Sequence, residues 1–304
     1  MKVGVIGVGV MGRNHVRIYS ELRGIDEIYI YDIDRTVLKK VCEQFEVIAC
    51  DSAHSLLKRV DAVSICVPTK YHFEIAKLAI ENDVSCLIEK PVTSTSREGE
   101  ELLKIAKNKE HLTIGVGHIE RFNPVVKEIK NLIKDPMYIE IRRHNPASSR
   151  ITDTSVVIDL MIHDIDLVWN YLLNCKDKFE LYSIGNDNIR KVIVKFGDCI
   201  VSLSASRVAC KKIRRIYIEE EEFTIDGNFM TQELYIYRKP KKYKTENVRY
   251  TQENIIEKVL VSKVEPLREE LKTFIKCVKE GKQFPVTLEQ GILNLKIAEK
   301  IEGL

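Results

Sequence analysis

The sequence predicts an α/β protein that begins with a doubly wound parallel sheet and continues into a second, α+β domain. Up to about residue 120, apolar strand-like segments alternate with helix-like segments, and a glycine-rich turn follows the first strand. From about Phe179 the pattern changes to closely spaced segments of alternating polarity, which indicates an antiparallel sheet. We therefore expect two domains, residues 1–120 and 121–304, with a C-terminal helix that can pack back on the first.

The composition is that of an ordinary globular chain. Its 304 residues are 44% apolar and 31% charged, and 48 basic against 45 acidic side chains give a net charge of +3. Such a balance predicts neither a nucleic-acid nor a membrane partner, and no apolar run reaches the ~18 residues of a membrane span. Eight cysteines without a C-x-x-C pair indicate reduced thiols and a cytoplasmic protein rather than disulfides or zinc.

The strands of the first domain are short and almost wholly apolar, as expected for a parallel sheet covered on both faces. They are read at "KVGVIG", "EIYIYD", "AVSICV", "VSCLIE" and "LTIGVG", the last of which is expected to close the sheet. Helical segments fall between them, the first at about residues 11–22.

The first turn, "GVGVMG", has the G-x-G-x-x-G spacing of a dinucleotide-binding turn. Gly7 permits the tight turn, Gly9 lets a pyrophosphate approach the backbone, and Gly12 lets helix and strand pack closely. The N–H groups of the helix that starts near Val10 and Met11 would face the phosphates. The alternative is a glycine turn without a ligand.

Asp32, twenty residues beyond Gly12, ends the second strand. Its carboxylate can accept both hydroxyls of an adenosine ribose and would repel a 2′-phosphate, which favours NAD over NADP. Ile33 follows it and is included in the expected cofactor site.

Two further strand ends point to the same edge, where ligands of open α/β sheets bind. "CVPTKYH" brings Pro68, Thr69 and His72 to this edge as candidates for ribose or nicotinamide contacts. "EKP" brings Glu89 and Lys90 to this edge. A lysine in such a rigid corner is less free to move than a surface lysine.

In the second domain, "SVVIDLMIHDID" has helical periodicity, so Asp159 and His163 lie four residues apart on one face. We expect both to point into the cleft between the domains. Asp164 points away, and Asp166 is placed to hold the imidazole of His163. A metal bound by Asp159, His163 and Asp166 is an alternative that nothing nearby in the sequence supports, and we expect no metal.

Together these motifs resemble the Gfo/Idh/MocA family of oxidoreductases: "GVGVMG" followed by "NH", Asp32, "CVPTKYH", "EKP" and D-x-x-x-H occur in the family's order. The resemblance implies a Rossmann domain and a second domain with a large, mainly antiparallel open sheet that makes homodimers or homotetramers. It also implies that the family's catalytic lysine, aspartate and histidine are Lys90, Asp159 and His163.

Chemistry suggests a role for each of these three residues. His163 is the expected general base, and Lys90 would donate a hydrogen bond to the reacting oxygen. Asp159 would orient the pair or bind a neighbouring hydroxyl. Some members of the family bind dinucleotide without turnover, as regulators, but the three residues favour an enzyme.

A finer resemblance, to nucleotide-sugar 3-dehydrogenases of this family, rests on "GHIERFNP", "HNPASSRITD" and "VVIDLMIHDID". It implies oxidation of the C3 hydroxyl of a UDP-sugar such as UDP-N-acetylglucosamine; other sugar or polyol substrates, including inositol, stay open. Arg121 and Arg150 could contact the diphosphate or form ion pairs. Asn123 could bind a sugar hydroxyl, but we expect it to cap the helix that begins with Pro124.

The remaining features are less specific. Thr154 and Ser155, either of which can cap the helix, stand where many members have glycines, so we expect a changed substrate pocket. The basic clusters "KKIRR" and "RKPKKYK" are expected to be solvated strand ends or loops. Residues 241–266 are polar and weakly patterned, and we expect a loop there.

Overall fold

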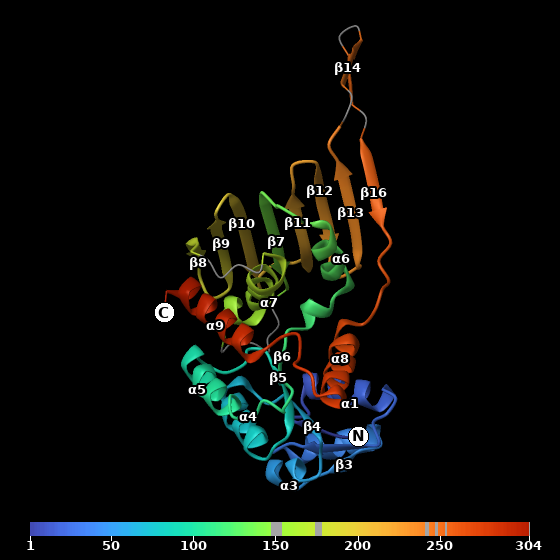
Figure 1. Cartoon of the computed structure of the whole chain (residues 1–304), viewed down its shortest axis with the longest axis vertical. Helices are drawn as coiled ribbons and strands as arrows, with labels where there is room; N and C mark the ends of the chain where they lie inside the picture. The colour runs from blue at the N-terminus through green and yellow to red at the C-terminus, as the bar shows by residue number, and fades with distance from the viewer. Residues whose placement is uncertain (147–153, 174–177, 241–242, 247–248, 253, 304) are drawn as a thin grey trace. The chain divides into compact units, whose positions relative to one another are not determined.

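The computed structural model describes residues 1–146, 154–173, 178–240, 243–246, 249–252 and 254–303. The chain divides into two compact units. The first contains Met1–Ile119 and Glu265–Lys296, and the second contains Glu120–Val264 and Ile297–Leu304. Figure 1 shows both units with their elements labelled.

The first unit is built on a six-stranded parallel sheet of order β3-β2-β1-β4-β5-β6, which confirms the predicted doubly wound fold. Its strands are β1 (Lys2–Ile6), β2 (Glu27–Tyr31), β3 (Ile48–Ala49), β4 (Ala62–Ile65), β5 (Ser85–Glu89) and β6 (Ile114–Gly117). The strand order reverses at β1, so the turn after β1 lies at the switch point where such sheets bind ligands. β6 closes the sheet, as the sequence predicts.

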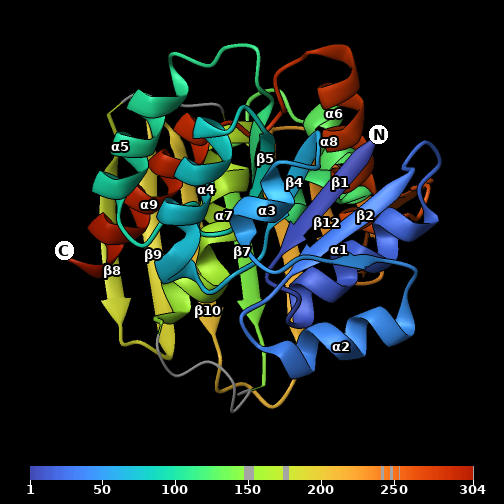
Figure 2. The same ribbon diagram turned by 90° about the horizontal axis from the view of Figure 1, so that it is seen from below.

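Helices fill the connections between these strands. They are α1 (Val10–Glu21), α2 (Arg35–Gln44), α3 (Ala53–Leu57), η1 (Thr69–Tyr71), α4 (His72–Glu81) and α5 (Ser96–Ala106). Figure 2 shows α3 and α4 beside β1, β4 and β5. The strands carry unbroken runs of buried apolar residues, as in β4, because helices cover a parallel sheet on both faces.

The C-terminal part of the chain is divided between the two units. α8 (Pro266–Glu280) and α9 (Leu288–Glu302) as far as Lys296 belong to the first unit, whereas the sequence predicts a second domain of residues 121–304 with a C-terminal helix that can pack back on the first. α8 packs against α1, and the backbone N–H of Val116 in β6 donates to the carbonyl of Val286 at 3.0 Å. Near the middle of the chain, the first unit ends at Ile119 and the second begins at Glu120.

The second unit contains an eight-stranded sheet of order β16-β13-β12-β11-β7-β10-β9-β8. Its strands are β7 (Tyr138–His144), β8 (Glu180–Gly185), β9 (Ile189–Phe196), β10 (Cys199–Ser206), β11 (Ile213–Glu219), β12 (Phe223–Asn228), β13 (Glu233–Arg238) and β16 (Ile255–Val259). All neighbours run antiparallel except β7 and β10. The large, mainly antiparallel sheet is therefore confirmed.

Helical segments cover one face of this sheet (Figure 1). They are α6 (Pro124–Leu132), which packs on β12, and a continuous run of η3 (Val157–Met161), α7 (Ile162–Asp166) and η4 (Leu167–Leu172). η2 (Ile119–Phe122) precedes α6. Because η3 packs against β7 and β10, the residues 157–172 lie over the centre of the sheet.

Three segments differ from the sequence prediction. β3 and β7 are not among the predicted strands, and residues 241–266 are predicted as a loop. The structure instead places β14 (Tyr243–Glu246) and β15 (Arg249–Gln252) in a two-stranded ribbon, followed by β16 at the edge of the large sheet. β16 was missed because its residues are mostly exposed, so no buried side of the strand marks its sequence.

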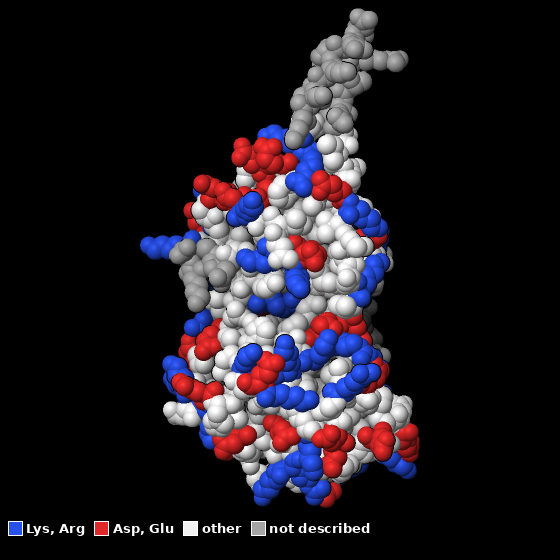
Figure 3. All heavy atoms as spheres, turned by 45° about the vertical axis from the view of Figure 1, so that its right-hand side comes forward, with Lys and Arg blue, Asp and Glu red and all other residues white. Residues whose placement is uncertain are grey.

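Acidic and basic side chains are interspersed over the face of the molecule drawn in Figure 3. Within the described residues, none of the helices combines the length and the apolar character needed to cross a membrane.

Candidate active site

The glycine turn after β1 has the geometry that a bound dinucleotide requires. Gly7 has φ +85°, and a Cβ there would lie 2.7 Å from the backbone of Cys66 and Val67. A Cβ on Gly12 would lie 1.9 Å from the carbonyl oxygen of Gly7, whereas a Cβ on Gly9 would meet nothing within 4 Å. The fold thus requires glycine at positions 7 and 12, because a side chain there would clash with the backbone. Gly9 instead borders open space where a phosphate can approach.

The start of α1 is open in the same way. Gly9 is its N-cap and brings no side-chain cap, and Val10 and Met11 in the first turn are 58% and 36% exposed. The first N–H groups of an uncapped helix are available to an anion. The residues present therefore fit the phosphates of a dinucleotide.

Asp32 follows β2 and is fastened to the glycine turn. Its Oδ2 accepts from the N–H of Val8 at 2.8 Å, and its Oδ1 accepts from the N–H of Asp34 at 2.9 Å. Each carboxylate oxygen has a second lone pair, so hydroxyls of a ribose can still be accepted. Ile33 next to it is 80% exposed and offers an apolar surface beside the expected ribose position.

His72 corrects one cofactor prediction. Pro68 and Thr69 begin η1 at the end of β4, as expected. The His72 ring, however, is 1% exposed, with Nδ1 2.8 Å from the carbonyl of Pro91 and Nε2 2.9 Å from that of Val67. Both ring nitrogens are directed at backbone oxygens, so His72 joins the two strand ends instead of reaching a ligand.

A hydrogen bond between Glu89 and the buried His15 anchors the "EKP" corner. Glu89 ends β5, and its Oε1 accepts from Nε2 of the fully buried His15 on α1 at 2.9 Å. Burial alone would raise the pKa of Glu89, but the hydrogen bond and charge of His15 hold that pKa below its ordinary value. Lys90 is half-buried and precedes Pro91 through a cis peptide bond. The contact of Glu89 with His15 thus anchors the residue that precedes the lysine.

The helix of Asp159 and His163 is not a simple α-helix. Five residues in α7 are flanked by the π turns η3 and η4, which are rare and frequent at functional sites. The hydroxyl of Ser155 accepts from the N–H groups of Val157 and Ile158 and thus caps the start. Asp159 and His163 are half-buried, whereas Asp164 and Asp166 are buried.

The two buried aspartates form ion pairs with arginines of the same unit. Asp164 binds Nε and Nη2 of Arg143, so it points away from the candidate site as expected. Asp166 receives Nε and Nη2 of Arg121 at 2.8 and 2.6 Å. Asp166 thus forms a bidentate ion pair with Arg121, and its expected role of holding His163 stays a prediction.

This pair also decides between the two interpretations of Arg121. Its side chain is 5% exposed and fastened to Asp166, so the ion pair is favoured over a diphosphate contact. Asn123 caps α6 through Val125 N–H, with Pro124 at the first position, which confirms the expected cap. Arg150 lies outside the described residues.

Sequence reasoning missed a buried charge cluster of Glu120, Arg143 and Arg214. Arg143 Nη1 donates to Glu120 Oε1 at 2.9 Å, and Arg214 Nη1 donates to the same oxygen at 3.3 Å. The available signal was the alternation Ile139, Ile141, Arg143, which places the arginine on the buried side of a strand.

The parallel sheet, the glycine turn and the acidic end of β2 together define a dinucleotide-binding oxidoreductase domain. Residues 1–118 match the family model described as the oxidoreductase family with an NAD-binding Rossmann fold, Gfo/Idh/MocA. UDP-N-acetylglucosamine 3-dehydrogenase from Acidithiobacillus ferrooxidans is 32% identical over 247 residues, 79% of this chain and 77% of that protein. The chain belongs to the Gfo/Idh/MocA family of NAD(P)-dependent oxidoreductases.

Other relatives are more distant. Myo-inositol 2-dehydrogenase from Thermotoga maritima is 24% identical over 97% of this chain and 93% of its own. Among solved structures, a UDP-N-acetylglucosamine 3-dehydrogenase from Acidithiobacillus ferrooxidans superposes with a TM-score of 0.88 at 28% identity, covering 99% and 96% of the chains. Levoglucosan dehydrogenase in complex with NADH and levoglucosan has a TM-score of 0.83 at 18% identity, covering 100% and 96%, and shares the fold.

Proposed function

We propose that this chain is an NAD-dependent dehydrogenase that oxidises the C3 hydroxyl of a UDP-sugar, such as UDP-N-acetylglucosamine, to a 3-keto sugar. The observation that carries the proposal is the 32% identity to UDP-N-acetylglucosamine 3-dehydrogenase across both units. The retained Lys90, Asp159 and His163 support catalysis over a regulatory role.

The proposed chemistry assigns one role to each of three side chains. Bound NAD would supply the acceptor for the hydride that leaves the carbinol carbon. His163 takes the hydroxyl proton as general base. Lys90 donates a hydrogen bond to the same oxygen and stabilises the negative charge that develops on it. Asp159 orients these groups or binds a neighbouring hydroxyl.

The preference for NAD rests on Asp32. Its two oxygens are directed by the N–H groups of Val8 and Asp34, so the negative charge has a fixed position at the end of β2. A 2′-phosphate at the ribose would meet this charge and be repelled.

An inositol or another polyol is the second candidate substrate, because myo-inositol 2-dehydrogenase is similar over nearly the whole chain. The test is a turnover panel of protein with NAD and UDP-sugars, free sugars and inositols, followed by nicotinamide absorbance. We expect reduction with UDP-N-acetylglucosamine. Reduction with inositol alone would contradict the nucleotide-sugar assignment, and tight NAD binding without any turnover would favour a regulator.

We also propose a homodimer or homotetramer formed through the uncovered face of the eight-stranded sheet. Apolar side chains pair on this face: Tyr182 with Ile193, and Tyr138 with Ile200. Tyr182, Ile193 and Ile200 are 68%, 38% and 45% exposed. Such an exposed apolar surface is typical of an interface.

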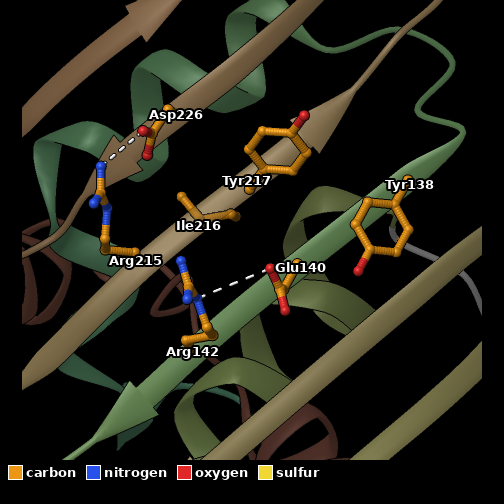
Figure 4. A pocket seen from close by; sticks show the side chains of 7 residues that line it. All are labelled: Tyr138, Glu140, Arg142, Arg215, Ile216, Tyr217 and Asp226. Atoms are coloured by element: carbon orange, nitrogen blue, oxygen red, sulfur yellow. Dashed lines mark hydrogen bonds and ion pairs between the residues drawn. The ribbon is translucent and has the colours of Figure 1, made fainter.

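Figure 4 shows a polar hollow on the same sheet. It is lined by Tyr138, Glu140, Arg142, Arg215, Ile216, Tyr217 and Asp226. Arg215 pairs with Asp226 at 2.7 Å.

Light scattering tests the proposed oligomer. We expect a dimer or tetramer, and we expect the Ile193→Glu variant to dissociate. A monomeric wild type at micromolar concentration would contradict the proposal.

A further inference from the structure

Arg143 and Arg214 lie side by side on the covered face of the eight-stranded sheet. They are direct cross-strand partners on β7 and β11. Arg143 has 1% exposure and is bonded to Asp164 and Glu120. Arg214 has 30% exposure and, among the described residues, one ion pair, which is 3.3 Å long and goes to the Glu120 oxygen that Arg143 already binds at 2.9 Å. Arg214 is therefore the member of the cluster that reaches solvent, and its hydrogen-bonding capacity is only partly used.

The guanidinium of Arg214 is also incompletely hydrogen-bonded. Its Nε is buried and has no hydrogen-bond partner in the described part of the chain. A buried donor without an acceptor is unfavourable, and an arginine fork suits the oxygens of a phosphate. This incompletely bonded and 30% exposed guanidinium thus suits an anionic ligand.

The electrostatic surroundings favour an anion at the same place. Burial and repulsion by Arg143 lower the pKa of Arg214, while Asp159 is among the charges that raise it, so this guanidinium lies within electrostatic range of the candidate catalytic aspartate. Lys212 is exposed, and repulsion by Arg214 is the largest influence lowering its pKa. Arg214 thus carries its positive charge within electrostatic range of Asp159, and Lys212 adds a second positive charge near Arg214.

Resting on the proposed function, we propose that Arg214 and Lys212 bind a phosphate of the sugar nucleotide's diphosphate beside Asp159. This assigns a ligand to the "KKIRR" segment, which the sequence suggested was only solvated. It also replaces Arg121, whose Nε and Nη2 are bonded to Asp166. The substrate class is therefore a sugar carrying a phosphate group, held at its anionic end while the sugar hydroxyl reacts.

The probe is UDP, titrated calorimetrically into the full-length protein saturated with NAD, so that the dinucleotide site is occupied. We expect Lys212→Met and Arg214→Met each to weaken UDP binding by roughly tenfold to a hundredfold, as for a lost hydrogen bond to a charged group. Lys211→Met and Arg215→Met are matched neighbours, and we expect them to bind UDP like the wild type. Arg214→Lys should restore part of the loss.

Lys212 is exposed, so its variant keeps the test decisive even if Arg214→Met does not fold. Wild-type UDP affinity in folded Lys212→Met and Arg214→Met, with a wild type that oxidises UDP-N-acetylglucosamine, would overturn this inference alone. A wild type that binds no UDP and oxidises only phosphate-free sugars would overturn it together with the proposed function. A KM for UDP-N-acetylglucosamine that rises in both variants at unchanged NAD affinity would support it.

Discussion

Nε2 of His15 in α1 lies 2.9 Å from Oε1 of Glu89 at the end of β5, and the imidazole is fully buried. This contact joins the helix that starts at the glycine turn to the corner that presents Lys90. Despite burial, which would raise it, the hydrogen bond and charge of His15 hold the pKa of Glu89 below its ordinary value of 4.5. A folded-state pKa below the unfolded one means that ionised Glu89 stabilises the fold.

The pair predicts a pH dependence of stability. The contribution of Glu89 is fully present above about pH 4.5 and is lost as the pH falls through its folded-state pKa. In this acidic range the wild type loses free energy of unfolding as the pH falls. We expect the Glu89→Gln variant to lose less, because it lacks the titrating carboxylate. Urea midpoints between about pH 3.5 and 7 measure it, with the exposed Glu101→Gln as control. Parallel curves for Glu89→Gln and wild type would contradict the assignment.

Gly12 and Gly9 predict opposite consequences of the same substitution. A Cβ at Gly12 would lie 1.9 Å from Gly7 O, so Gly12→Ala should destabilise the fold by about 1–3 kcal/mol or more. At Gly9 the space is open, so Gly9→Ala should keep the melting temperature and weaken NAD binding by roughly tenfold. Calorimetry of unfolding and of NAD binding separates the two. Unchanged NAD binding in Gly9→Ala would contradict a phosphate at this turn.

Asp32 should set the dinucleotide preference. We expect Asp32→Ala to raise the KM for NAD by roughly tenfold and to relax discrimination against NADP. Because Asp32 also accepts from Val8 N–H, Asp32→Asn is the better-matched variant: it keeps an acceptor and removes the charge. Steady-state kinetics with both dinucleotides provides the measurement. An unchanged NAD to NADP ratio in both variants would refute the role of Asp32.

Lys90 should act on the substrate rather than the cofactor. We expect Lys90→Met to lower kcat by at least about 10²-fold, as for loss of a donor that stabilises a developing oxyanion, while NAD affinity stays nearly unchanged. Lys104→Met, on the exposed side of α5, is the control and should keep wild-type kinetics. Loss of NAD binding in Lys90→Met would assign this lysine to the cofactor instead.

The sequence predicts the first sheet well because its signals are local. Apolar runs bounded by glycine or proline mark β1, β4 and β5, and the glycine spacing marks the switch point. β3 was missed because two exposed residues carry no pattern. The return of residues 265–296 to the first unit depends on long-range packing, which no local periodicity encodes.

In the candidate site, residue types were predictable and partners were not. The spacing of Asp159 and His163 is readable in the sequence, but the π turns around them are not. Arg121 binds Asp166 from 45 residues away in the sequence, and sequence spacing gives no sign of such a partner. His72 was expected to touch a ligand, but tertiary contacts direct both of its nitrogens to backbone carbonyls.

The division of the chain has a consequence for its synthesis. β6 relies on segments that follow the last strand of the large sheet in the sequence: Thr113 Oγ1 donates to Lys282 O at 2.9 Å, and Gly115 faces the ring of Phe284. A ribosome therefore releases all eight strands of the large sheet before the residues that finish the dinucleotide-binding unit emerge. A fragment cut at residue 120 lacks these residues, so it should expose β6 and the surface of α1 that α8 covers.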